Sequence, residues 1–199
     1  MISKKSQQLG SGAFGSVFKT ANIHNPAHQV AIKVLDKQKL RDNVDLIMEE
    51  VAILNTLDHP NIVKYYETYD DNKYIYLVME YISGVQLFTK ITNTANQAFS
   101  EAQAAKYMRS LFMAINHCHA QGIVHRDIKP ENIMINEEDD VRLIDFGLSK
   151  ASKRKNMHTV AGTPFYMAPE VLLENYASKA DIWSLGVLLY TLVSGYLPF

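Results

Sequence analysis

The sequence has little cysteine and almost no net charge, and both deficits narrow the classes of protein to consider. Its 199 residues include one cysteine, Cys118, which excludes a disulfide framework and fits a reducing compartment. The formal net charge is −1, so no global basic field argues for a nucleic acid or an anionic membrane. We therefore expect a cytoplasmic protein with no nucleic-acid partner, in which any phosphate site is local.

Long apolar runs are also missing. The stretch Met1–Leu9 has no apolar signal-peptide core. The most apolar run, Ile182–Val193, is too short to span a bilayer and contains Ser184 and Gly186, so we interpret it as a buried helix. Internal repeats and low-complexity segments are absent from the sequence. What is present is the composition of a globular protein, with 47% hydrophobic and 21% charged residues, in a length that suits one large domain or two small lobes.

The first part of the chain, residues 1–81, is predicted to be an antiparallel sheet with one helix. Strands are expected over 5–36, a helix over 42–57, and a hairpin over 62–69 and 74–81. Alternation from Gln29 to Leu35 places two sets of side chains on opposite faces of a strand: Val30, Ile32 and Val34 on one, Ala31, Lys33 and Leu35 on the other.

The second part, residues 82–199, is predicted to be mainly helical, which makes the fold class α+β. A capping box, Ser100 with Gln103, begins a helix that Gly122 follows. Its apolar stripe contains Ala104, Tyr107, Met108, Leu111, Phe112 and Ile115. A second helix is expected to begin at 178–181, and short strands are expected over 133–135 and 141–144. The last residues, 195–199, read as a helix exit into a loop, so we expect a fragment whose second lobe is incomplete.

A glycine-rich stretch, 10–17 (GSGAFGSV), is the first motif with chemical meaning. Its glycines, Gly10, Gly12 and Gly15, allow a sharp turn and a close approach of backbone N–H groups to phosphates. The same spacing occurs in ordinary sheet turns and in the dinucleotide-binding fingerprint. The fingerprint needs a helix after the loop, whereas Val17 begins more strand, which disfavours that alternative.

Lys33, in the run VAIK, is the next candidate. A lysine in an alternating strand usually faces solvent. This one closely follows the glycine-rich stretch and precedes a helix that carries Glu49 and Glu50. A lysine that points at phosphates needs a carboxylate to orient it, and we assign that role to Glu50, with Glu49 facing solvent.

Two acidic motifs complete the set. In the stretch 125–132 (HRDIKPEN), Asp127 can accept a proton from an attacking hydroxyl, Lys129 can hold the transferring phosphoryl group, and Asn132 can bind metal. Asp145 opens the tripeptide DFG after an apolar strand, where a hard oxygen ligand suits Mg²⁺. The tripeptide alone would also suit a strand-end turn.

Taken in order, these motifs and the APE tripeptide at 168–170 resemble the catalytic domain of eukaryotic protein kinases over nearly the whole chain. Lys129 and the run GTP at 162–164 resemble the serine/threonine branch. Stretches such as 50–54 (EVAIL), 57–63 (LDHPNIV) and 181–187 (DIWSLGV) resemble the calcium- and calmodulin-regulated group, especially calcium-dependent protein kinases. Those kinases carry a calcium sensor or autoinhibitory segment C-terminal to the catalytic domain, and the chain ends before one.

The resemblance implies a bilobal fold and an enzyme that transfers the ATP γ-phosphate to protein serine or threonine with Mg²⁺. It implies that Asp127 orients the substrate hydroxyl and that Asn132 and Asp145 hold Mg²⁺. It implies an ATP site at Gly10, Gly12, Gly15, Val17, Ala31, Lys33, Met79, Glu80, Ile82, Gln86 and Met134. It also implies a stacked core of Leu54, Tyr65, His125 and Phe146, anchored by Asp181. The alternatives are a pseudokinase scaffold and another nucleotide-binding protein.

The resemblance leads to one expectation about regulation and one about peptide selectivity. Thr159 is the candidate activation-loop phosphosite, with Arg126 and Lys150 as its cationic partners. Because Leu46 stands where a third cation is common, we expect only modest dependence on that phosphate. Glu131 is expected to bind a basic residue two positions before the acceptor. Gln86 and Thr191 are neutral where the family often has acids, so we expect a shallow preference for basic peptides.

Overall fold

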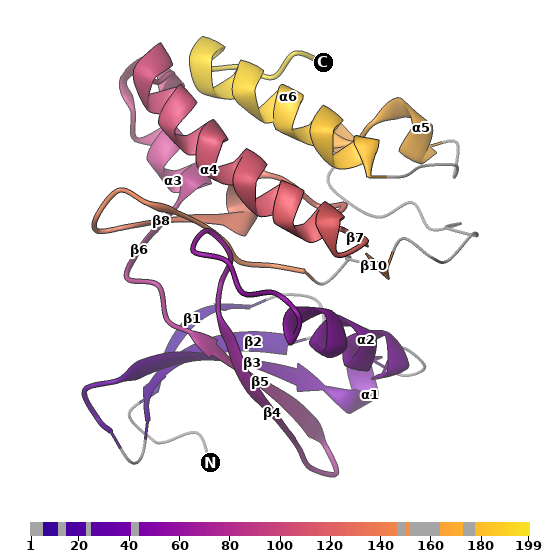
Figure 1. Ribbon diagram of the computed structural model, residues 1–199. Helices are drawn as coiled ribbons and strands as arrows, with labels where there is room; N and C mark the ends of the chain where they lie inside the picture. The colour runs from indigo at the N-terminus through magenta and orange to yellow at the C-terminus, as the bar shows by residue number, and fades with distance from the viewer. Residues whose placement is uncertain are drawn as a thin grey trace. The chain divides into compact units, whose positions relative to one another are not determined.

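The computed structural model describes residues 6–11, 15–22, 25–40, 44–146, 150–151, 164–172 and 178–199; within these ranges the side chains of 44–46, 49, 50, 150, 151, 164 and 172 are not described. The chain divides into two compact units, coloured from indigo to yellow along the sequence in Figure 1. Unit 1 contains Met1–Thr56 and Val63–Ile82, and unit 2 contains Leu57–Ile62 and Ser83–Phe199.

Unit 1 is a five-stranded sheet with helices. Its elements are β1 (Gln7–Ser11), β2 (Gly15–Ala21), β3 (Gln29–Asp36), α1 (Lys37–Leu40), α2 (Val44–Leu54), β4 (Tyr65–Asp70) and β5 (Tyr74–Glu80). The strand order is β1-β2-β3-β5-β4, and each neighbouring pair is antiparallel. The predicted antiparallel sheet with one main helix is therefore confirmed.

One face of this sheet carries the core of unit 1. Its buried members are Leu35, Leu40, Val51, Ile75 and Leu77, with Ile47, Tyr65 and Met79 packed against them. Leu35 and Ile75 are direct cross-strand neighbours, so their side chains point to the same face. The alternation predicted for β3 places Leu35 on that face together with Lys33, and the register agrees.

Unit 2 combines short sheets with two long helices. Its elements are β6 (Gly84–Gln86), α3 (Leu87–Thr92), the 3₁₀ turn η2 (Ala95–Gln97), α4 (Glu101–Ala120), β7 (Ile123–Val124), η3 (Pro130–Asn132), β8 (Ile133–Asn136), β9 (Val141–Leu143), β10 (Lys150–Ala151), η4 (Pro164–Tyr166), α5 (Pro169–Leu172) and α6 (Lys179–Ser194). The strands form a β6-β8-β9 sheet and a β7-β10 pair. Helices α4 and α6 run side by side (Figure 1).

The helix α4 forms for the reasons that the sequence indicates. The Ser100 side chain accepts a hydrogen bond from the Gln103 N–H at 3.3 Å, which satisfies one of the free donors of the first turn. After the last turn Gly122 has φ +72, and its N–H donates to His119 at 2.9 Å, so a glycine is suited to this exit. The predicted helix and both of its ends are confirmed.

Four local predictions need correction. The capping box is only half formed, because the Gln103 side chain donates to Asp139 instead. Phe112 is 42% exposed and lies outside the buried stripe. The strand predicted from residue 62 begins at Tyr65, because Ile62 forms a parallel bridge with Leu143 in unit 2. The apolar helix α6 is buried on one face only; Ile182, Trp183, Leu189, Tyr190 and Val193 are exposed.

Candidate active site

In unit 1 four candidate ATP-site residues share one face of the sheet. Val17 lies directly opposite Lys33 across the β2–β3 ladder, and Ala31 lies directly opposite Met79 across the β3–β5 ladder. Directly opposed residues point to the same side, and Ala31 and Lys33 are two apart on one strand. The register therefore brings Val17, Ala31, Lys33 and Met79 together. Lys33 is half-buried on this face and takes part in a polar interaction.

The glycine-rich stretch joins β1 to β2, and its two described glycines differ. A Cβ atom on Gly15 would lie 1.8 Å from the backbone oxygen of Val34, so only glycine fits where β2 passes β3. A Cβ atom on Gly10 would meet no described atom within 4 Å. Gly12 lies outside the described residues. Gly15 is therefore required by the packing of the sheet, whereas the fold of the described residues does not require Gly10.

The end of β5 is tied to the segment before β4. The Glu80 N–H donates to the Lys64 carbonyl at 2.8 Å, and the Lys64 N–H donates to Glu80 Oε2 at 3.1 Å. Ile82, predicted to bind the adenine edge, follows two residues later and ends unit 1. The orienting partner predicted for Lys33, Glu50, lies on α2, but its side chain is outside the described residues.

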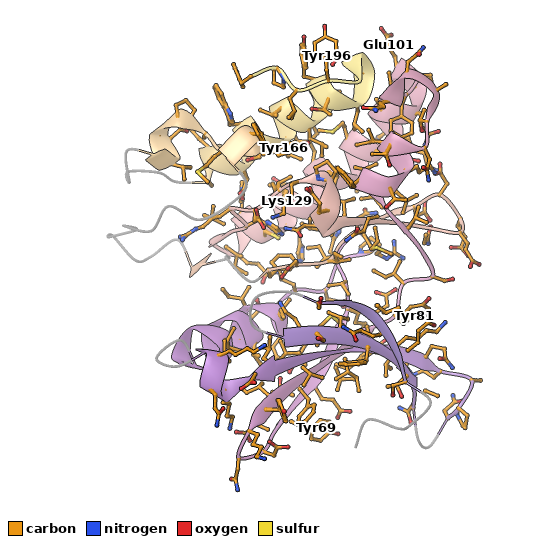
Figure 2. The ribbon with its side chains drawn as sticks, turned by 180° about the vertical axis from the view of Figure 1, so that it is seen from behind. Tyr69, Tyr81, Glu101, Lys129, Tyr166 and Tyr196 are labelled. Carbon is orange, nitrogen blue, oxygen red and sulfur yellow. The ribbon has the colours of Figure 1, made fainter. Side chains whose placement is uncertain are left out.

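In unit 2 the predicted catalytic segment, residues 125–132, converges on Asp127; it is called the catalytic segment below. Asn132 Nδ2 donates to both the backbone oxygen and Oδ2 of Asp127, each at 2.8 Å. Lys129 Nζ forms an ion pair with the same Oδ2 at 2.8 Å; Figure 2 labels Lys129. Asp127, Lys129 and Asn132, which the sequence groups by spacing alone, are therefore brought together in space. The carboxylate of Asp127 is held by a charged and a neutral donor, which fixes its orientation.

The backbone of the catalytic segment is held by a buried carboxylate on α6. Asp181, which is 0% exposed, accepts hydrogen bonds from the N–H groups of His125 and Arg126 at 2.9 and 2.8 Å. Arg126 has φ +73, an uncommon conformation for a residue other than glycine, and such strain persists only where surrounding contacts enforce it. The bond from Arg126 to Asp181 is one such contact, so Asp181 helps to set the course of the chain into Asp127.

The His125 ring forms part of the interior. It lies edge-on to Phe146 at 4.7 Å between ring centroids and is 0% exposed. Burial lowers the pKa of His125, against the opposing fields of Asp181, Asp145 and Asp127. The pair His125–Phe146 agrees with the stacked core that the sequence predicts, and a structural role follows for this histidine. The other two predicted members, Leu54 and Tyr65, belong to unit 1.

The two predicted metal ligands lie at the open end of the β8–β9 hairpin. Asn132 directly precedes β8, and the Ile144 N–H donates to the Asn132 carbonyl at 3.0 Å, with Asp145 as the next residue. The amide nitrogen of Asn132 is used on Asp127, which leaves its Oδ1 as the atom that can bind a cation. An amide oxygen and a carboxylate are hard donors, and Mg²⁺ takes few protein ligands besides phosphates and water, so this pair fits the ion.

The candidate peptide-recognition residues also lie in unit 2. Gln86 Nε2 donates to the backbone oxygen of Glu131 at 3.0 Å, and Gln86 is directly opposite Met134 in the β6–β8 ladder. The Glu131 Oε2 atom is buried and receives no hydrogen bond from the described residues. Burial raises the pKa of Tyr166 to about 12, and the Glu131 carboxylate contributes to that rise. Glu131 therefore has a carboxylate oxygen without a hydrogen-bond donor among the described residues, which suits a cationic partner.

Sequence reasoning missed two polar residues that organise unit 2. His119, in the last turn of α4, contacts Asp181 through Nε2 at 2.7 Å. Asp139, in the β8–β9 turn, accepts hydrogen bonds from α3 and α4. Neither belongs to a motif with a spacing that could signal it, because each partner is at least 32 residues away in the sequence. The predicted phosphosite, Thr159, lies outside the described residues.

Comparison with known proteins gives one consistent family. The family model described as "Protein kinase domain" matches residues 3–199. "Calcium-dependent protein kinase 5" of Plasmodium berghei is 43% identical over 96% of this chain and 34% of its own length. "Calcium/calmodulin-dependent protein kinase type 1" of Macrobrachium nipponense is 40% identical over 96% of this chain and 56% of its own length. "CBL-interacting serine/threonine-protein kinase 12" of Arabidopsis thaliana is 43% identical over 96% of this chain and 40% of its own length.

The chain thus spans between about a third and somewhat over half of the length of these relatives. All three are named as kinases, and two carry calcium in their names. Among the described residues, no helix combines the length and the apolar character needed to cross a membrane.

Proposed function

This chain belongs to the protein kinase domain family, and from that premise we propose that its parent protein transfers the γ-phosphate of ATP to serine or threonine hydroxyls of proteins. The observation that carries the proposal is the convergence of Lys129 and Asn132 on the Asp127 carboxylate at 2.8 Å. A general base must be both oriented and close to the groups that hold its substrate, and this cluster supplies the orientation. The pseudokinase alternative, a scaffold without transfer, has no support from relatives that are all named as kinases.

In this proposal Asp127 accepts the proton of the attacking hydroxyl. Lys129 neutralises charge on the transferring group and, through its ion pair with Oδ2, holds the Asp127 carboxylate in place. Asn132 holds Asp127 with its amide nitrogen and offers its amide oxygen to Mg²⁺, with the carboxylate of Asp145 as the second ligand. When bound, Mg²⁺ supplies neutralisation of phosphate charge. Positioning and charge neutralisation, rather than covalent catalysis, are the work of these side chains.

The nucleotide is proposed to bind the face of the unit 1 sheet that carries Val17, Ala31, Lys33 and Met79. Lys33 would bind the α- and β-phosphates with Glu50 as its partner, and the glycine-rich stretch would cover the phosphates. Backbone groups of Glu80 and Ile82 would bind the edge of adenine. In unit 2, Met134 would contact adenine and Gln86 the ribose. We propose that residues 1–81 and 82–199 act as the two lobes of one kinase domain.

Regulation is proposed to involve parts of the protein outside the described residues. Phosphorylation of Thr159 would give modest activation through Arg126 and Lys150. A calcium-sensing or calmodulin-binding segment beyond Phe199 would suit the two relatives that carry calcium in their names.

The test of the proposed function is phosphate transfer by the full-length protein from ATP to serine, threonine and tyrosine peptides in the presence of Mg²⁺. We expect transfer to serine and threonine. Lys33→Met and Asp145→Asn should remove nearly all of it. Asp127→Asn should lower kcat by about 10²- to 10⁴-fold, the usual contribution of general acid–base catalysis, with a smaller change in ATP affinity.

Asp140→Asn is the matched control, because it removes the same charge at a surface residue of the β8–β9 turn. Its rate should stay within about twofold of wild type, as is usual for surface changes. Equal transfer by wild type and Asp145→Asn, or transfer to tyrosine alone, would overturn the assignment.

A further inference from the structure

The β8–β9 hairpin has an open end, beside the candidate metal ligands, and a closed end, which is its turn. Its ladder contains the three register pairs Ile133–Leu143, Met134–Arg142 and Ile135–Val141, a length of about 10 Å at the usual rise per residue. The open end carries both candidate metal ligands, Asn132 and Asp145. The closed end is the turn that contains Asp139, where the Asp139 N–H donates to Asn136 and the Asn136 N–H donates to Asp140, both at 3.0 Å. In so short a hairpin, the placement of the turn affects the placement of the ligands.

The turn has an aspartate at a position where glycine would have a lower steric cost. Asp139 has φ +63, the left-handed conformation that a hairpin loop of this kind normally gives to glycine or asparagine. Glycine adopts this conformation without the steric cost of a Cβ atom. An aspartate at this position therefore has a cost that its side chain must offset.

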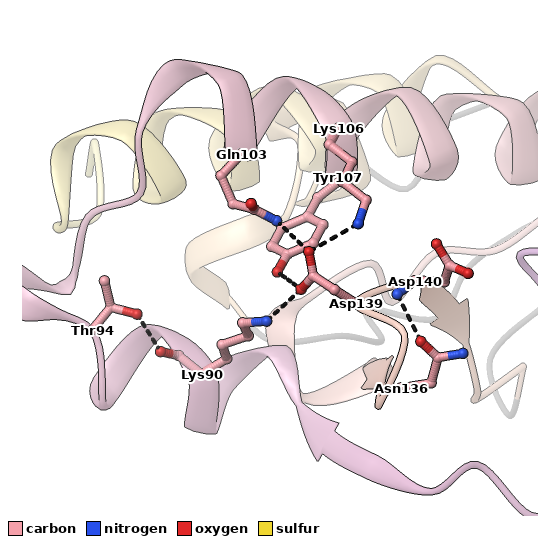
Figure 3. A network of polar contacts seen from close by, with 8 residues as sticks. All are labelled: Lys90, Thr94, Gln103, Lys106, Tyr107, Asn136, Asp139 and Asp140. Carbon is pink, nitrogen blue, oxygen red and sulfur yellow. Dashed lines mark hydrogen bonds and ion pairs between the residues drawn. The ribbon is translucent and has the colours of Figure 1, made fainter.

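The Asp139 side chain offsets that cost by binding two helices (Figure 3). Lys90 of α3 reaches Oδ1 at 2.5 Å, as does the Tyr107 hydroxyl of α4. Gln103 and Lys106 of α4 reach Oδ2 at 2.8 and 2.9 Å. Burial alone would raise the pKa of Asp139, but these hydrogen bonds outweigh it and hold the pKa well below its ordinary value. Tyr107 is fully buried, so this network is more than a pair of exposed ions.

Helix α4 connects this network to the catalytic segment. Its N-terminal half supplies Gln103, Lys106 and Tyr107 to Asp139. Its last turn supplies His119 to Asp181, and Asp181 holds the backbone of His125 and Arg126. The hairpin that carries the metal ligands and the segment that carries Asp127 are thus both fastened to one helix.

We propose that Asp139 is a positioning residue for catalysis: by fastening the closed end of the β8–β9 hairpin to α3 and α4, it fixes Asn132 and Asp145 as a pair of metal ligands in register with Asp127. The proposal rests on the proposed function, because it takes these two residues as metal ligands. It predicts that Asp139 acts on metal binding and not only on folding.

The experiment compares Asp139→Asn, Asp139→Gly and the control Asp140→Asn in the full-length protein. Asparagine keeps the shape and tolerates φ +63, but it removes the charge. Glycine relieves the backbone and removes every side-chain contact. Two readouts are independent of phosphate transfer: the dissociation constant of Mn²⁺, used as a probe with ADP and detected by electron paramagnetic resonance, and hydrogen exchange of the Ile144 amide, whose N–H closes the open end on Asn132.

Both Asp139 variants should weaken Mn²⁺ binding by about threefold or more, the lower range for coupling through a packed network, and should accelerate exchange at Ile144. Asp140→Asn should change neither. If the Asp139 variants do not fold, Lys90→Gln, which removes one contact from α3, should shift both readouts in the same direction.

A lower melting temperature with unchanged Mn²⁺ binding and unchanged Ile144 exchange would show a purely structural role and overturn the proposal. Failure of the proposed function can be distinguished from failure of the inference about Asp139. A wild type that transfers no phosphate defeats the proposed function. An active wild type whose Asp139 variants behave like Asp140→Asn defeats this inference alone.

Discussion

At the scale of single residues, Gly10 and Gly15 show that one motif can contain glycines with different tasks. Gly15→Ala would force a Cβ atom to within 1.8 Å of the Val34 oxygen, whereas Gly10→Ala has open space among the described atoms. We expect Gly15→Ala to lower the free energy of unfolding by about 1–3 kcal/mol, as overpacking does, and Gly10→Ala to leave it within about 1 kcal/mol.

Chemical denaturation followed by circular dichroism measures the free energy of unfolding of both variants. Calorimetry of ATP binding tests whether Gly10 is needed for the approach of phosphate. If Gly10 is present for the approach of phosphate, Gly10→Ala should weaken ATP binding in a protein of normal stability. Equal destabilisation by the two substitutions would contradict the difference between the two sites.

Gln86 and Glu131 allow a prediction about peptide selectivity. Glu131 should give a preference for a basic residue two positions before the acceptor, and Glu131→Gln should flatten it. Gln86→Glu should strengthen preference for arginine three positions before, because charge-assisted bonds are roughly twice as strong as neutral ones. The structure adds a condition: the Gln86 amide donates to the Glu131 carbonyl, and a carboxylate at 86 would lose that bond and turn away from the carbonyl oxygen.

A positional-scanning peptide array on the full-length protein tests this prediction, with Asp140→Asn as the charge-matched control. A dominant arginine requirement three positions before the acceptor, unchanged in Gln86→Glu, would refute it.

At the scale of elements, the segment 57–62 and helix α4 carry a pH-sensitive contact. The His59 and His117 rings lie 5.2 Å apart, and His59 Nδ1 accepts the Asn61 N–H at 3.1 Å. Burial and then the charge of His117 lower the pKa of His59 below its ordinary 6.5. The unfolded chain therefore takes up the proton first. The contribution of His59 to stability is complete above pH 6.5 and is lost as the pH falls below that value.

We expect the free energy of unfolding to fall from pH 7 to pH 5, and His59→Asn to make that slope shallower. Asparagine offers an oxygen that can replace Nδ1 as acceptor but has no group that titrates in this range. The slope should not vanish, because buried His125 also has a lowered pKa and acts with the same sign. Denaturant titrations at several pH values measure the slope. A variant slope equal to that of wild type would exclude His59 as a source.

The elements also show which structural features can be predicted from the sequence and which cannot. Periodicity and capping predicted α4 and its ends, because these signals are local. The fate of the Gln103 side chain depends on Asp139, 36 residues away, and the true start of β4 depends on Ile62 pairing with Leu143. The catalytic segment was predictable because Asp127, Lys129 and Asn132 lie within six residues of one another. The Asp139 network was not, because its members come from three separate elements.

At the scale of the whole molecule, helix α6 of the 199-residue chain exposes an apolar side. The buried side carries Leu185, Leu188 and Leu192, each 0% exposed. The opposite side carries Trp183, Leu189, Tyr190 and Val193, each between 37 and 41% exposed. A helix that is apolar all round is normally buried, and contiguous apolar surface favours association.

We therefore expect this chain, prepared by itself, to self-associate at micromolar to millimolar concentration. The double variant Leu189→Glu, Val193→Lys should remain monomeric, because it places a favourable charge pair four residues apart on the exposed side of the helix and leaves the buried leucines intact. Its melting temperature should match that of wild type. Sedimentation velocity measures the association, and the control variant Phe112→Glu, Met113→Lys changes exposed apolar residues on α4 instead. Monomeric wild type, or equal rescue by the α4 control, would show that the α6 side does not determine association.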